Sequence, residues 1–380
     1  MRILHTECSR GWGGQELRIL AEACGMAGRG HEVWLAAPPE SRIAGAADAR
    51  GIPVVSVGFR RPWGLGDVAV LRRTIGRLGI QVLNTHSSWD AWIGGLAGRL
   101  AGKGVRVVRT RHLSTPIPHS RSSRFLYMRL ADHVVTTGEA IRQRMIEEND
   151  FAGDRITSVV TGVDLPRFRP AREAAVVRQA LGLPANVPVV GTVSTIRSWK
   201  GHLDLLAAIA SLRADRDIRG LLVGDGPYAE VVRSRVRELR LEGAMVMPGQ
   251  REDVADLLSA MDVFAFPSTA NEGVPQAVLQ AMALRRPVVA ARVGGIPEVV
   301  RDGETGLLVS ARDPSALARA IGRAMDDAPA AQRWVKTAAD LVQAEYTVEA
   351  MLGKMEAIYQ RVRVSGLADC RDADTARGRS

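Results

Sequence analysis

One segment in the second half of the chain carries the residues best suited to bind an elongated ligand that contains a sugar. Glu272 is followed by Gly273 and Val274, and Pro275 suits the first position of a helix. Backbone N–H groups at a helix start attract anions, whereas a carboxylate is a strong acceptor for sugar hydroxyls. Gln280 follows Glu272 after nearly two helical turns, so both side chains are expected on one face. The spacing predicts one helix that holds two polar parts of one ligand.

A second segment supplies positive charge. Arg197 and Lys200 follow an apolar run, and Gly201 precedes a segment with helical periodicity. Two cations beside a helix start form a site suited to a diphosphate. The alternative is a solvated basic loop, but the position at the carboxyl end of a strand favours the anion site.

Two weaker candidates lie in the first half. Gly13 and Gly14 belong to a glycine-rich turn that either brings the backbone close to an anion or only shapes the turn. The turn is not a dinucleotide fingerprint, because Glu16 stands where GxGxxG requires glycine. His112 follows a predicted strand at the edge where open α/β sheets bind ligands, although a lone histidine is usually a structural hydrogen-bonding group.

Short β-branched runs, each followed by a segment with helical periodicity, must position these residues. This alternation predicts parallel sheets covered by helices, in two doubly wound domains in series. The predicted strands are 2–6, 33–37, 54–57, 82–85, 105–109, 134–137 and 157–160, then 189–193, 221–223, 245–247, 263–266, 288–290 and 307–309.

The length of 380 residues also fits two domains and a cleft between them. We predict an N-terminal acceptor-binding domain over 1–168 and a C-terminal donor-binding domain over 169–345. An amphipathic helix over 346–364 is expected to pack back on the first domain. The polar tail 365–380 has no periodic apolar face and is expected to be disordered.

Composition narrows the class of protein. The hydrophobic fraction is 46%, and no apolar run approaches the roughly 20 residues of a membrane span. The first residues lack the zones of a signal peptide. The three cysteines are too few and too scattered for a disulfide framework or a zinc site. We therefore expect a cytoplasmic protein.

The charge is uneven: residues 1–170 hold 24 Lys/Arg and 15 Asp/Glu, whereas residues 171–380 hold 27 and 26. A basic first half suggests an anionic partner, such as an anionic membrane surface or a phosphorylated acceptor. An arginine-rich usage on solvated faces explains the same bias. Basic stretches without interleaved aromatic residues argue against nucleic acid.

At the helix that follows Glu272, the chain resembles family 4 of the retaining glycosyltransferases. The resemblance covers most of the chain. It is carried by Gly13-Gly14-Gln15-Glu16, Gly30-His31-Glu32-Val33, Arg111-His112, Gly162-Val163-Asp164, Lys200-Gly201, Gly224-Asp225-Gly226-Pro227, Gly294-Gly295-Ile296-Pro297-Glu298 and Gly306-Leu307-Leu308-Val309. It implies two Rossmann-like domains that face each other across a cleft.

The resemblance also implies a role for each candidate. Arg197 and Lys200 would hold the diphosphate of a nucleotide sugar, Glu272 and the following N–H groups the sugar, and position 280 the ribose. His112 and Gly14 would contact the donor from the first domain. Further donor-binding positions would be Gly13, Gly201, Gly224, Gln250, Gly273, Val274 and Pro275. The chain departs from the family at Gln280, where a second glutamate is usual, and at Thr195, where many members have arginine.

The reaction implied by the resemblance is sugar transfer with retention of configuration. No pair of aspartates is placed in the sequence to hold a metal, so we expect a reaction without cofactor or metal. The segments 84–90 and 109–114 resemble the members that build lipopolysaccharide and other surface glycans, which implies a glycan or lipid-linked acceptor. Alternatives are a sugar epimerase or phosphorylase of the same fold, and a non-catalytic glycan- or membrane-binding protein. A nicotinamide dehydrogenase is disfavoured because a well-phased GxGxxG is absent.

Overall fold

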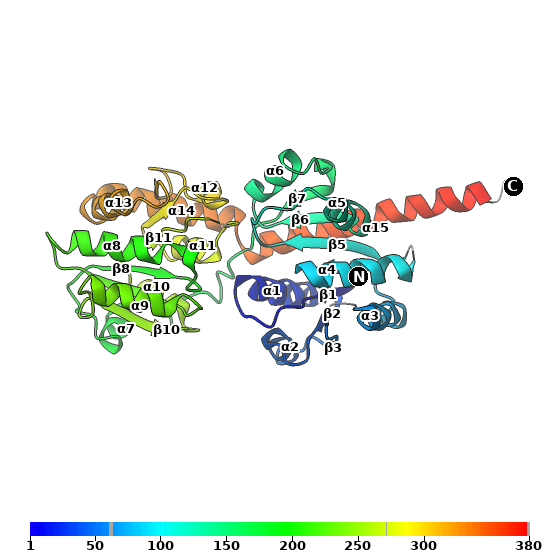
Figure 1. Ribbon diagram of the computed structural model, residues 1–380, viewed down its shortest axis with the longest axis horizontal. Helices are drawn as coiled ribbons and strands as arrows, with labels where there is room; N and C mark the ends of the chain where they lie inside the picture. The colour runs from blue at the N-terminus through cyan, green and yellow to red at the C-terminus, as the bar shows by residue number, and fades with distance from the viewer. Residues whose placement is uncertain (61–63, 103, 271, 378–380) are drawn as a thin grey trace. The chain divides into compact units, whose positions relative to one another are not determined.

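The computed structural model describes residues 1–60, 64–102, 104–270 and 272–377. The chain forms two compact units, shown in Figure 1. The first comprises Met1–Thr161 with Val348–Ser380, and the second comprises Gly162–Thr347. The division thus falls after Thr161, a few residues before the position predicted at 168.

The first unit contains a seven-stranded parallel sheet in the order β3-β2-β1-β4-β5-β6-β7. Every residue of β4 and β6 is buried, because helices cover both faces of the sheet. The strands are β1 (Arg2–Thr6), β2 (Glu32–Ala37), β3 (Val54–Ser56), β4 (Val82–Thr85), β5 (Arg106–Arg111), β6 (His133–Thr136) and β7 (Ile156–Ser158). The connecting helices are α1 (Gly14–Gly28), α2 (Arg42–Asp48), α3 (Leu65–Leu78), α4 (Ser88–Ala101), α5 (Arg121–Phe125), η1 (Leu126–Leu130), α6 (Glu139–Glu147) and η2 (Gly153–Arg155).

The second unit contains a six-stranded parallel sheet in the order β10-β9-β8-β11-β12-β13. Its strands are β8 (Val189–Val193), β9 (Arg219–Val223), β10 (Met245–Gly249), β11 (Val263–Phe266), β12 (Val288–Ala291) and β13 (Leu307–Val309). Its helices are α7 (Ala174–Ala180), η3 (Ser198–Lys200), α8 (His202–Leu212), α9 (Ala229–Glu238), α10 (Val254–Ser259), α11 (Gln276–Ala283), α12 (Ile296–Val299), α13 (Pro314–Asp326) and α14 (Ala328–Glu345). The predicted class, two Rossmann-like parallel-sheet domains, is confirmed.

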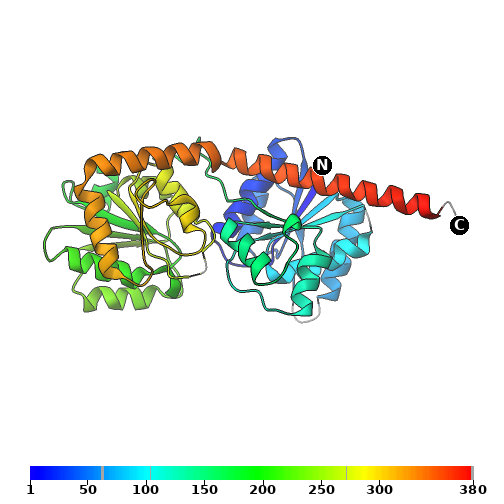
Figure 2. The same ribbon diagram turned by 90° about the horizontal axis from the view of Figure 1, so that it is seen from above.

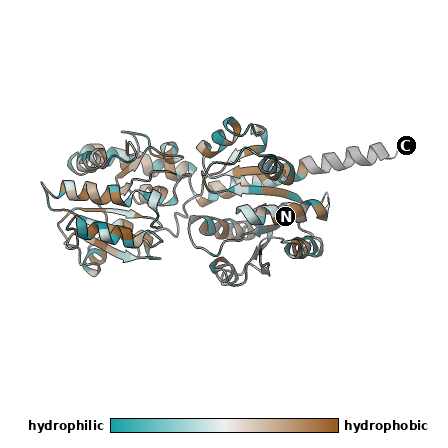
Figure 3. Cartoon of the chain, in the orientation of Figure 1, coloured by the Kyte–Doolittle hydropathy of each residue, from teal (hydrophilic) through white to brown (hydrophobic). Residues whose placement is uncertain are grey.

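Local sequence explains where several helices begin. Asp313 and Asp327 precede α13 and α14, and each carboxylate accepts a hydrogen bond from a backbone N–H in the first turn. Hydrophilic and hydrophobic residues share the helices that cover the second sheet (Figure 3), as expected when one face packs and the other meets solvent. No helix in the described part of the chain is both long and apolar enough to cross a bilayer.

The last helix, α15 (Val348–Arg377), belongs to the first unit and lies beside α1 (Figure 2). Met351, Met355 and Tyr359 are buried in the same cluster as Ile19 of α1. The backbone is helical through 365–377, where the sequence predicts disorder, and this stretch contains no proline that would end the helix. Residues 378–380 of the predicted tail lie outside the described residues.

Each sheet has a point where the chain reverses its direction of travel across the strands. In the first sheet this point lies between β1 and β4, and in the second it lies between β8 and β11. Connections leave in opposite directions there, so a crevice opens at the carboxyl ends of the two strands, and this is where open α/β sheets bind ligands. These two edges are where the predicted site residues must be sought.

Candidate functional site

The loops after β8 and β11 meet at the reversal point of the second sheet. Thr269 donates its backbone N–H to the carbonyl of Trp199 at 2.7 Å, which ties the two loops together. Gly201 has a φ of 69° and packs so closely on Pro267 that a Cβ would lie 1.9 Å from the Pro267 carbonyl oxygen. Only glycine satisfies both conditions, so the backbone itself brings the two loops together.

Lys200 and Glu272 form an ion pair at the centre of this crevice. Lys200 Nζ donates a hydrogen bond to Glu272 Oε1 at 2.7 Å, and the Ser268 hydroxyl donates to the same oxygen at 2.6 Å. Lys200 Nζ also lies 5.1 Å from the ring centroid of Phe266. The pair leaves two ammonium N–H bonds and the second carboxylate oxygen for a ligand. Ser268, which the sequence analysis did not single out, orients the carboxylate.

The helix start after Glu272 differs by one residue from the prediction. α11 begins at Gln276, and Pro275 is the residue before it, with an extended backbone (ψ 129°). Val274 is buried and Gly273 is half-buried, so both line the approach to the helix. Gln280 is half-buried, whereas Val278, Leu279, Ala281 and Met282 are buried. Gln280 therefore lies on the outward side of α11.

A third loop supports Glu272 from below. Gly294 has a φ of 54°, and a Cβ there would lie 2.1 Å from the Glu272 carbonyl oxygen. The backbone N–H of Gly295 donates to that same oxygen at 3.2 Å. The paired glycines that follow β12 thus hold the backbone of Glu272.

Two further predicted positions lie at the same edge of the sheet. Gly224 follows β9 and has a φ of 137°, and its N–H donates to the carbonyl of Gly249 at 2.9 Å. A Cβ at Gly224 would lie 1.9 Å from the Ser194 carbonyl oxygen, in the loop that leads to Lys200. Gln250 follows Gly249 and is exposed.

Arg197 stands apart from the ion pair. Its side chain is exposed, and the guanidinium lies 5.3 Å from the ring centroid of Trp199. His202, at the start of α8, is buried and its Nε2 lies 2.9 Å from the Ser194 hydroxyl oxygen. Burial, and then the charge of Lys200, lowers the pKa of His202 to about 4. His202 is therefore a neutral structural residue of this loop.

In the first unit, the glycine-rich turn folds around Glu7. The buried Glu7 carboxylate accepts hydrogen bonds from the Ser9 N–H at 2.7 Å, the Ser87 hydroxyl at 2.6 Å and the Gln15 amide. Gly13 precedes α1 with extended backbone, and Gly14 begins the helix and is exposed. Burial raises the pKa of Glu7, and the hydrogen bonds from Ser87, Ser9 and Gln15 oppose this rise. Because the carboxyl group of Glu7 already uses donors of this turn, the turn is less suited to a phosphate than its glycines suggest.

Asp90, in the first turn of α4, is fully buried beside this turn. Its Oδ2 accepts hydrogen bonds from the Thr6 hydroxyl at 2.6 Å and the His86 N–H at 2.9 Å. No described residue bonds its Oδ1. Burial, and then the charge of Glu7, raises the pKa of Asp90 to about 8. Neither acid was predicted, since their proximity requires β1 to pair with β4.

Asp90→Asn should make the folded chain less sensitive to rising pH. A folded-state pKa above the unfolded value of about 3.9 means that the folded chain keeps a proton that the unfolded chain releases. The stabilisation that this bound proton gives to the folded chain is complete below about pH 4 and is lost as the pH rises through about 8. The free energy of unfolding falls by up to about 1.4 kcal/mol per pH unit in this range. Urea unfolding at pH 5 and pH 8 measures this loss. Asn removes the titration, so a variant with an unchanged loss contradicts the prediction; the exposed Asp48→Asn is the control.

His112 follows β5 at the carboxyl edge of the first sheet, as its position in the sequence predicts. Its Nε2 lies 3.0 Å from His86 Nδ1, and His86 Nε2 lies 3.0 Å from His5 Nδ1. The three rings come from β1, the end of β4 and the end of β5, which are neighbours in the sheet. His112 is thus the outer member of a chain of histidines rather than a lone histidine.

The structure therefore unites part of the predicted set. Lys200, Gly201, Glu272, Gly273, Val274 and Pro275 gather at one crevice of the second unit, with Gly224 and Gln250 at the ends of neighbouring strands. Gly13, Gly14 and His112 lie in the first unit. Among the described residues, no group of three His, Cys, Asp or Glu is arranged to hold a metal ion.

A cavity of about 530 Å³ occurs elsewhere in the second unit. Pro188, Asp262 and Pro287 line it, at the starts of β8, β11 and β12. It therefore opens at the opposite edge of the sheet from Lys200 and Glu272, where parallel sheets do not usually place their chemistry.

Two family models match the chain, one in each half. Residues 12–167 match the model described as Glycosyltransferase Family 4, and residues 187–327 match the model described as Glycosyl transferases group 1. D-inositol 3-phosphate glycosyltransferase of Saccharomonospora viridis is 32% identical over 352 residues, which cover 82% of this chain and 80% of that protein. The enzyme of the same name from Corynebacterium diphtheriae is 30% identical, over 76% of this chain and 72% of that protein.

Solved structures share the fold. A glycosyltransferase from Rickettsia africae superposes with a TM-score of 0.86 at 22% identity, covering 95% of this chain and 98% of that one. HepE from Anabaena, solved in complex with UDP-glucose, superposes with a TM-score of 0.86 at 24% identity, covering 95% and 100%. At these identities the likeness concerns the fold alone.

Proposed function

Because this chain belongs to family 4 of the glycosyltransferases, we propose that it transfers a sugar from a nucleotide diphosphate to a hydroxyl acceptor with retention of configuration. The donor binds at the crevice of the second sheet. Lys200 contacts the diphosphate and Glu272 contacts the sugar hydroxyls. Gln280, on the outward side of α11, accepts or donates hydrogen bonds at the ribose.

The Lys200–Glu272 ion pair is the observation that carries this proposal. A cation and a carboxylate 2.7 Å apart, at the reversal point of a parallel sheet, match a ligand with an anionic part joined to a polyhydroxyl part. The anionic diphosphate is attracted to Lys200 and repelled by Glu272. The neutral sugar hydroxyls donate hydrogen bonds to the Glu272 carboxylate. A nucleotide sugar has both parts, because its diphosphate is joined directly to its sugar.

The reaction needs stabilisation of the leaving group more than a strong base. The bond between the sugar C1 and the phosphate oxygen breaks, and the bond between C1 and the acceptor oxygen forms on the same face. The acceptor proton passes to an oxygen of the departing phosphate. Charge that grows on the diphosphate is stabilised by Lys200, Arg197 and the N–H groups before α11. This assignment requires no protein nucleophile.

Arg197→Ala should lower kcat/KM for transfer by about tenfold, because the exposed guanidinium supplies a charge-assisted contact to the diphosphate. We propose that Arg197 takes the place of the arginine that many family members have at position 195. Steady-state rates with a saturating acceptor measure the effect. Arg333→Ala, which removes an exposed arginine from α14, is the matched control. Unchanged turnover in Arg197→Ala argues against the assignment.

Transfer should persist in EDTA. The proposal places protein cations, and not a divalent metal, at the leaving diphosphate. Rates are measured in about 1 mM EDTA and again after addition of excess Mn²⁺. The two rates should agree within about twofold. Loss of activity in EDTA that manganese restores contradicts the metal-free mechanism.

The acceptor proposed first is a phosphorylated polyol. The relatives from Saccharomonospora and Corynebacterium are named for D-inositol 3-phosphate, and the first half of this chain is basic. A glycan or lipid-linked acceptor of surface-polysaccharide synthesis is the second candidate. Asn84 and Thr110, one from each of the segments 84–90 and 109–114 that suggest it, are buried and hydrogen-bonded to each other at 2.9 Å, so these two residues support the fold of the first unit.

A two-stage experiment tests the proposal. Thermal shift with a panel of nucleotide sugars, beginning with UDP-glucose, identifies the donor through the stabilisation it confers. Transfer to D-inositol 3-phosphate or to lipid-linked glycans is then measured, and NMR of the product reports the anomeric configuration. Donor binding without transfer or hydrolysis favours a non-catalytic binding protein. Consumption of donor without acceptor favours an epimerase, and an inverted product contradicts retention.

The basic first half also supports a proposal of peripheral contact with an anionic membrane surface from the cytoplasmic side. Several of its arginines are already engaged within the unit: Arg29 pairs with Glu356 at 2.7 Å and Arg99 with Asp132 at 3.0 Å. Sedimentation with phosphatidylglycerol vesicles, compared with phosphatidylcholine vesicles, tests the contact.

A further inference from the structure

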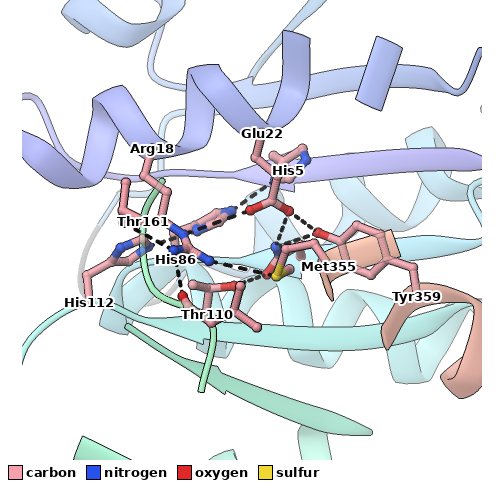
Figure 4. Close-up of polar contacts among 11 residues, drawn as sticks. His5, Arg18, Glu22, His86, Thr110, His112, Thr161, Met355 and Tyr359 are labelled. Carbon is pink, nitrogen blue, oxygen red and sulfur yellow. Dashed lines mark hydrogen bonds and ion pairs between the residues drawn. The ribbon is translucent and has the colours of Figure 1, made fainter. Parts of the chain in front are cut away.

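Three histidines form a continuous hydrogen-bonded chain in the first unit (Figure 4). His5 and His86 are stacked with ring centroids 5.3 Å apart, and His86 and His112 have the same separation. His5 and His86 are buried, whereas His112 is half-buried. The chain therefore runs from the interior to the surface at the carboxyl edge of the sheet.

A second buried network closes the inner end of the chain. Arg18 donates to the carbonyl of Val159 at 2.7 Å, and its Nε lies 4.0 Å from Glu22 Oε2. Glu22 Oε1 accepts hydrogen bonds from Tyr359 and from Asn84. Figure 4 shows Arg18 and Glu22 from the same helix beside the imidazoles. The charges of this network thus act on rings that water does not screen.

All three rings are uncharged at neutral pH. Burial lowers the pKa of each of them, and the charge of Arg18 lowers all three further. Arg109 adds to the effect on His86 and His112, and only Glu22 opposes it, at His5. A neutral imidazole carries one N–H and one acceptor nitrogen. Three neutral rings joined by two hydrogen bonds therefore place one remaining proton at one end of the chain, either on His5 Nε2 or on His112 Nδ1.

The two ends of the chain of histidines differ in which groups can accept a hydrogen bond from that N–H. His5 Nε2 is buried and bonds none of the described residues, and Glu22 Oε2 does not accept from it. The neighbouring Arg18 Nε–H is likewise a buried donor with no acceptor in the described structure. A buried N–H without an acceptor is rare in proteins because it loses its hydrogen bond to water, whereas half-buried His112 keeps access to solvent or ligand. The environment therefore favours the proton on His112 Nδ1.

We propose that His86 and His5 are positioning residues that hold His112 in its neutral Nδ1–H form, so that His112 presents a hydrogen-bond donor at the edge of the sheet. His5 Nδ1–H donates to His86 Nε2, and His86 Nδ1–H donates to His112 Nε2. Resting on the proposed function, this assigns His112 Nδ1–H to an oxygen of a substrate that binds at this edge of the first sheet. His112 then stabilises that oxygen and does not act as the base that takes the acceptor proton.

Long-range ¹H–¹⁵N NMR of the full chain with ¹⁵N-labelled histidine tests the tautomer without any substrate. In the wild type at pH 7, His112 Nδ1 is expected to carry the proton and Nε2 to be unprotonated. Each histidine signal is assigned by its loss in a variant in which that one histidine is replaced. A wild-type spectrum with the proton on His112 Nε2 overturns the proposal, whether or not the chain transfers sugar.

Two substitutions at His86 separate positioning from packing. His86→Asn places an amide near the former Nδ1 and keeps a donor to His112, whereas His86→Gln places its amide near the former Nε2 and loses that donor. His112 is expected to keep the Nδ1–H form in His86→Asn and to lose this preference in His86→Gln. His133→Gln is the control, because His133 on β6 bonds Thr157 at 2.9 Å and lies outside the chain of histidines.

Transfer rates should follow the tautomer. We expect kcat in His86→Gln to fall about tenfold with the donor KM changed less than about twofold, and His86→Asn to stay within about twofold of wild type. If His86→Gln changes the tautomer but not kcat, or if both variants lose activity equally while folded by circular dichroism, the positioning role is overturned. If no nucleotide sugar supports transfer in wild type, the proposed function fails, and the NMR spectra still decide the tautomer.

Discussion

Lys200→Met should reduce kcat/KM for transfer by about 10²- to 10³-fold, because one preorganised group that stabilises developing charge is typically worth about 3 to 4 kcal/mol of barrier. Lys200 Nζ is held 2.7 Å from Glu272 and against the Phe266 ring, so it needs no reorganisation when the diphosphate departs. The loss should fall mainly on kcat, since the negative charge on the phosphate grows in the transition state. Steady-state kinetics with varied donor concentration measure the two constants.

The same substitution leaves Glu272 buried without its cation. Removing one partner of a buried pair destabilises strongly, so part of any lost activity could come from lost folding. Glu272→Gln and the double variant complete a cycle that separates the pair energy from the catalytic effect. Lys336→Met, at an exposed position of α14, is the matched control and should behave as wild type. Activity of Lys200→Met within about threefold of the folded wild type would falsify the leaving-group role.

Gly201→Ala should separate the two loops that form the crevice of the second sheet. An alanine at φ 69° costs about 1 to 2 kcal/mol of backbone strain. In addition, the new Cβ would lie 1.9 Å from the Pro267 carbonyl oxygen, so the loops after β8 and β11 must separate. Because Lys200 precedes this glycine and Glu272 belongs to the loop after β11, we expect transfer to fall by at least about 10²-fold.

Gly303→Ala separates the effect of backbone strain from the effect of a steric clash. Gly303 has a φ of 74°, close to that of Gly201, but a Cβ there would meet nothing within 4 Å. Thermal unfolding should therefore show a small loss in Gly303→Ala and a larger one in Gly201→Ala, and only the latter should lose transfer activity. Equal losses of stability with retained activity in both variants would show that the close approach to Pro267 is unimportant.

The strands were predictable from the sequence because each is a short β-branched run between turn residues. β1, β4, β8, β11 and β13 begin and end at the predicted residues. The start of α11 was misplaced by one residue, since proline restricts φ but leaves ψ to the contacts that follow it, and Pro275 is extended. The division between the units was placed a few residues late, because the boundary depends on which core each residue joins.

The site was predictable only in part. Local chemistry singled out Glu272, Lys200 and their glycines as candidates, but the ion pair that joins Lys200 to Glu272 spans 72 residues of sequence. Ser268 and the pair Glu7 and Asp90 were missed, since a buried serine or acid gives no sign in a single sequence of the partner it meets.

By itself, the sequence determined the features that depend on neighbours along the chain: the runs that become strands, the glycine turns, and the residue types at the carboxyl ends of β8 and β11. Only the tertiary structure decided which of these ends meet. The order of strands places Lys200 beside Glu272, and His112 beside His86 and His5, across separations that local patterns do not encode. The physical reason is that strand pairing is chosen by burial of both faces of the sheet, and this is a property of the whole domain.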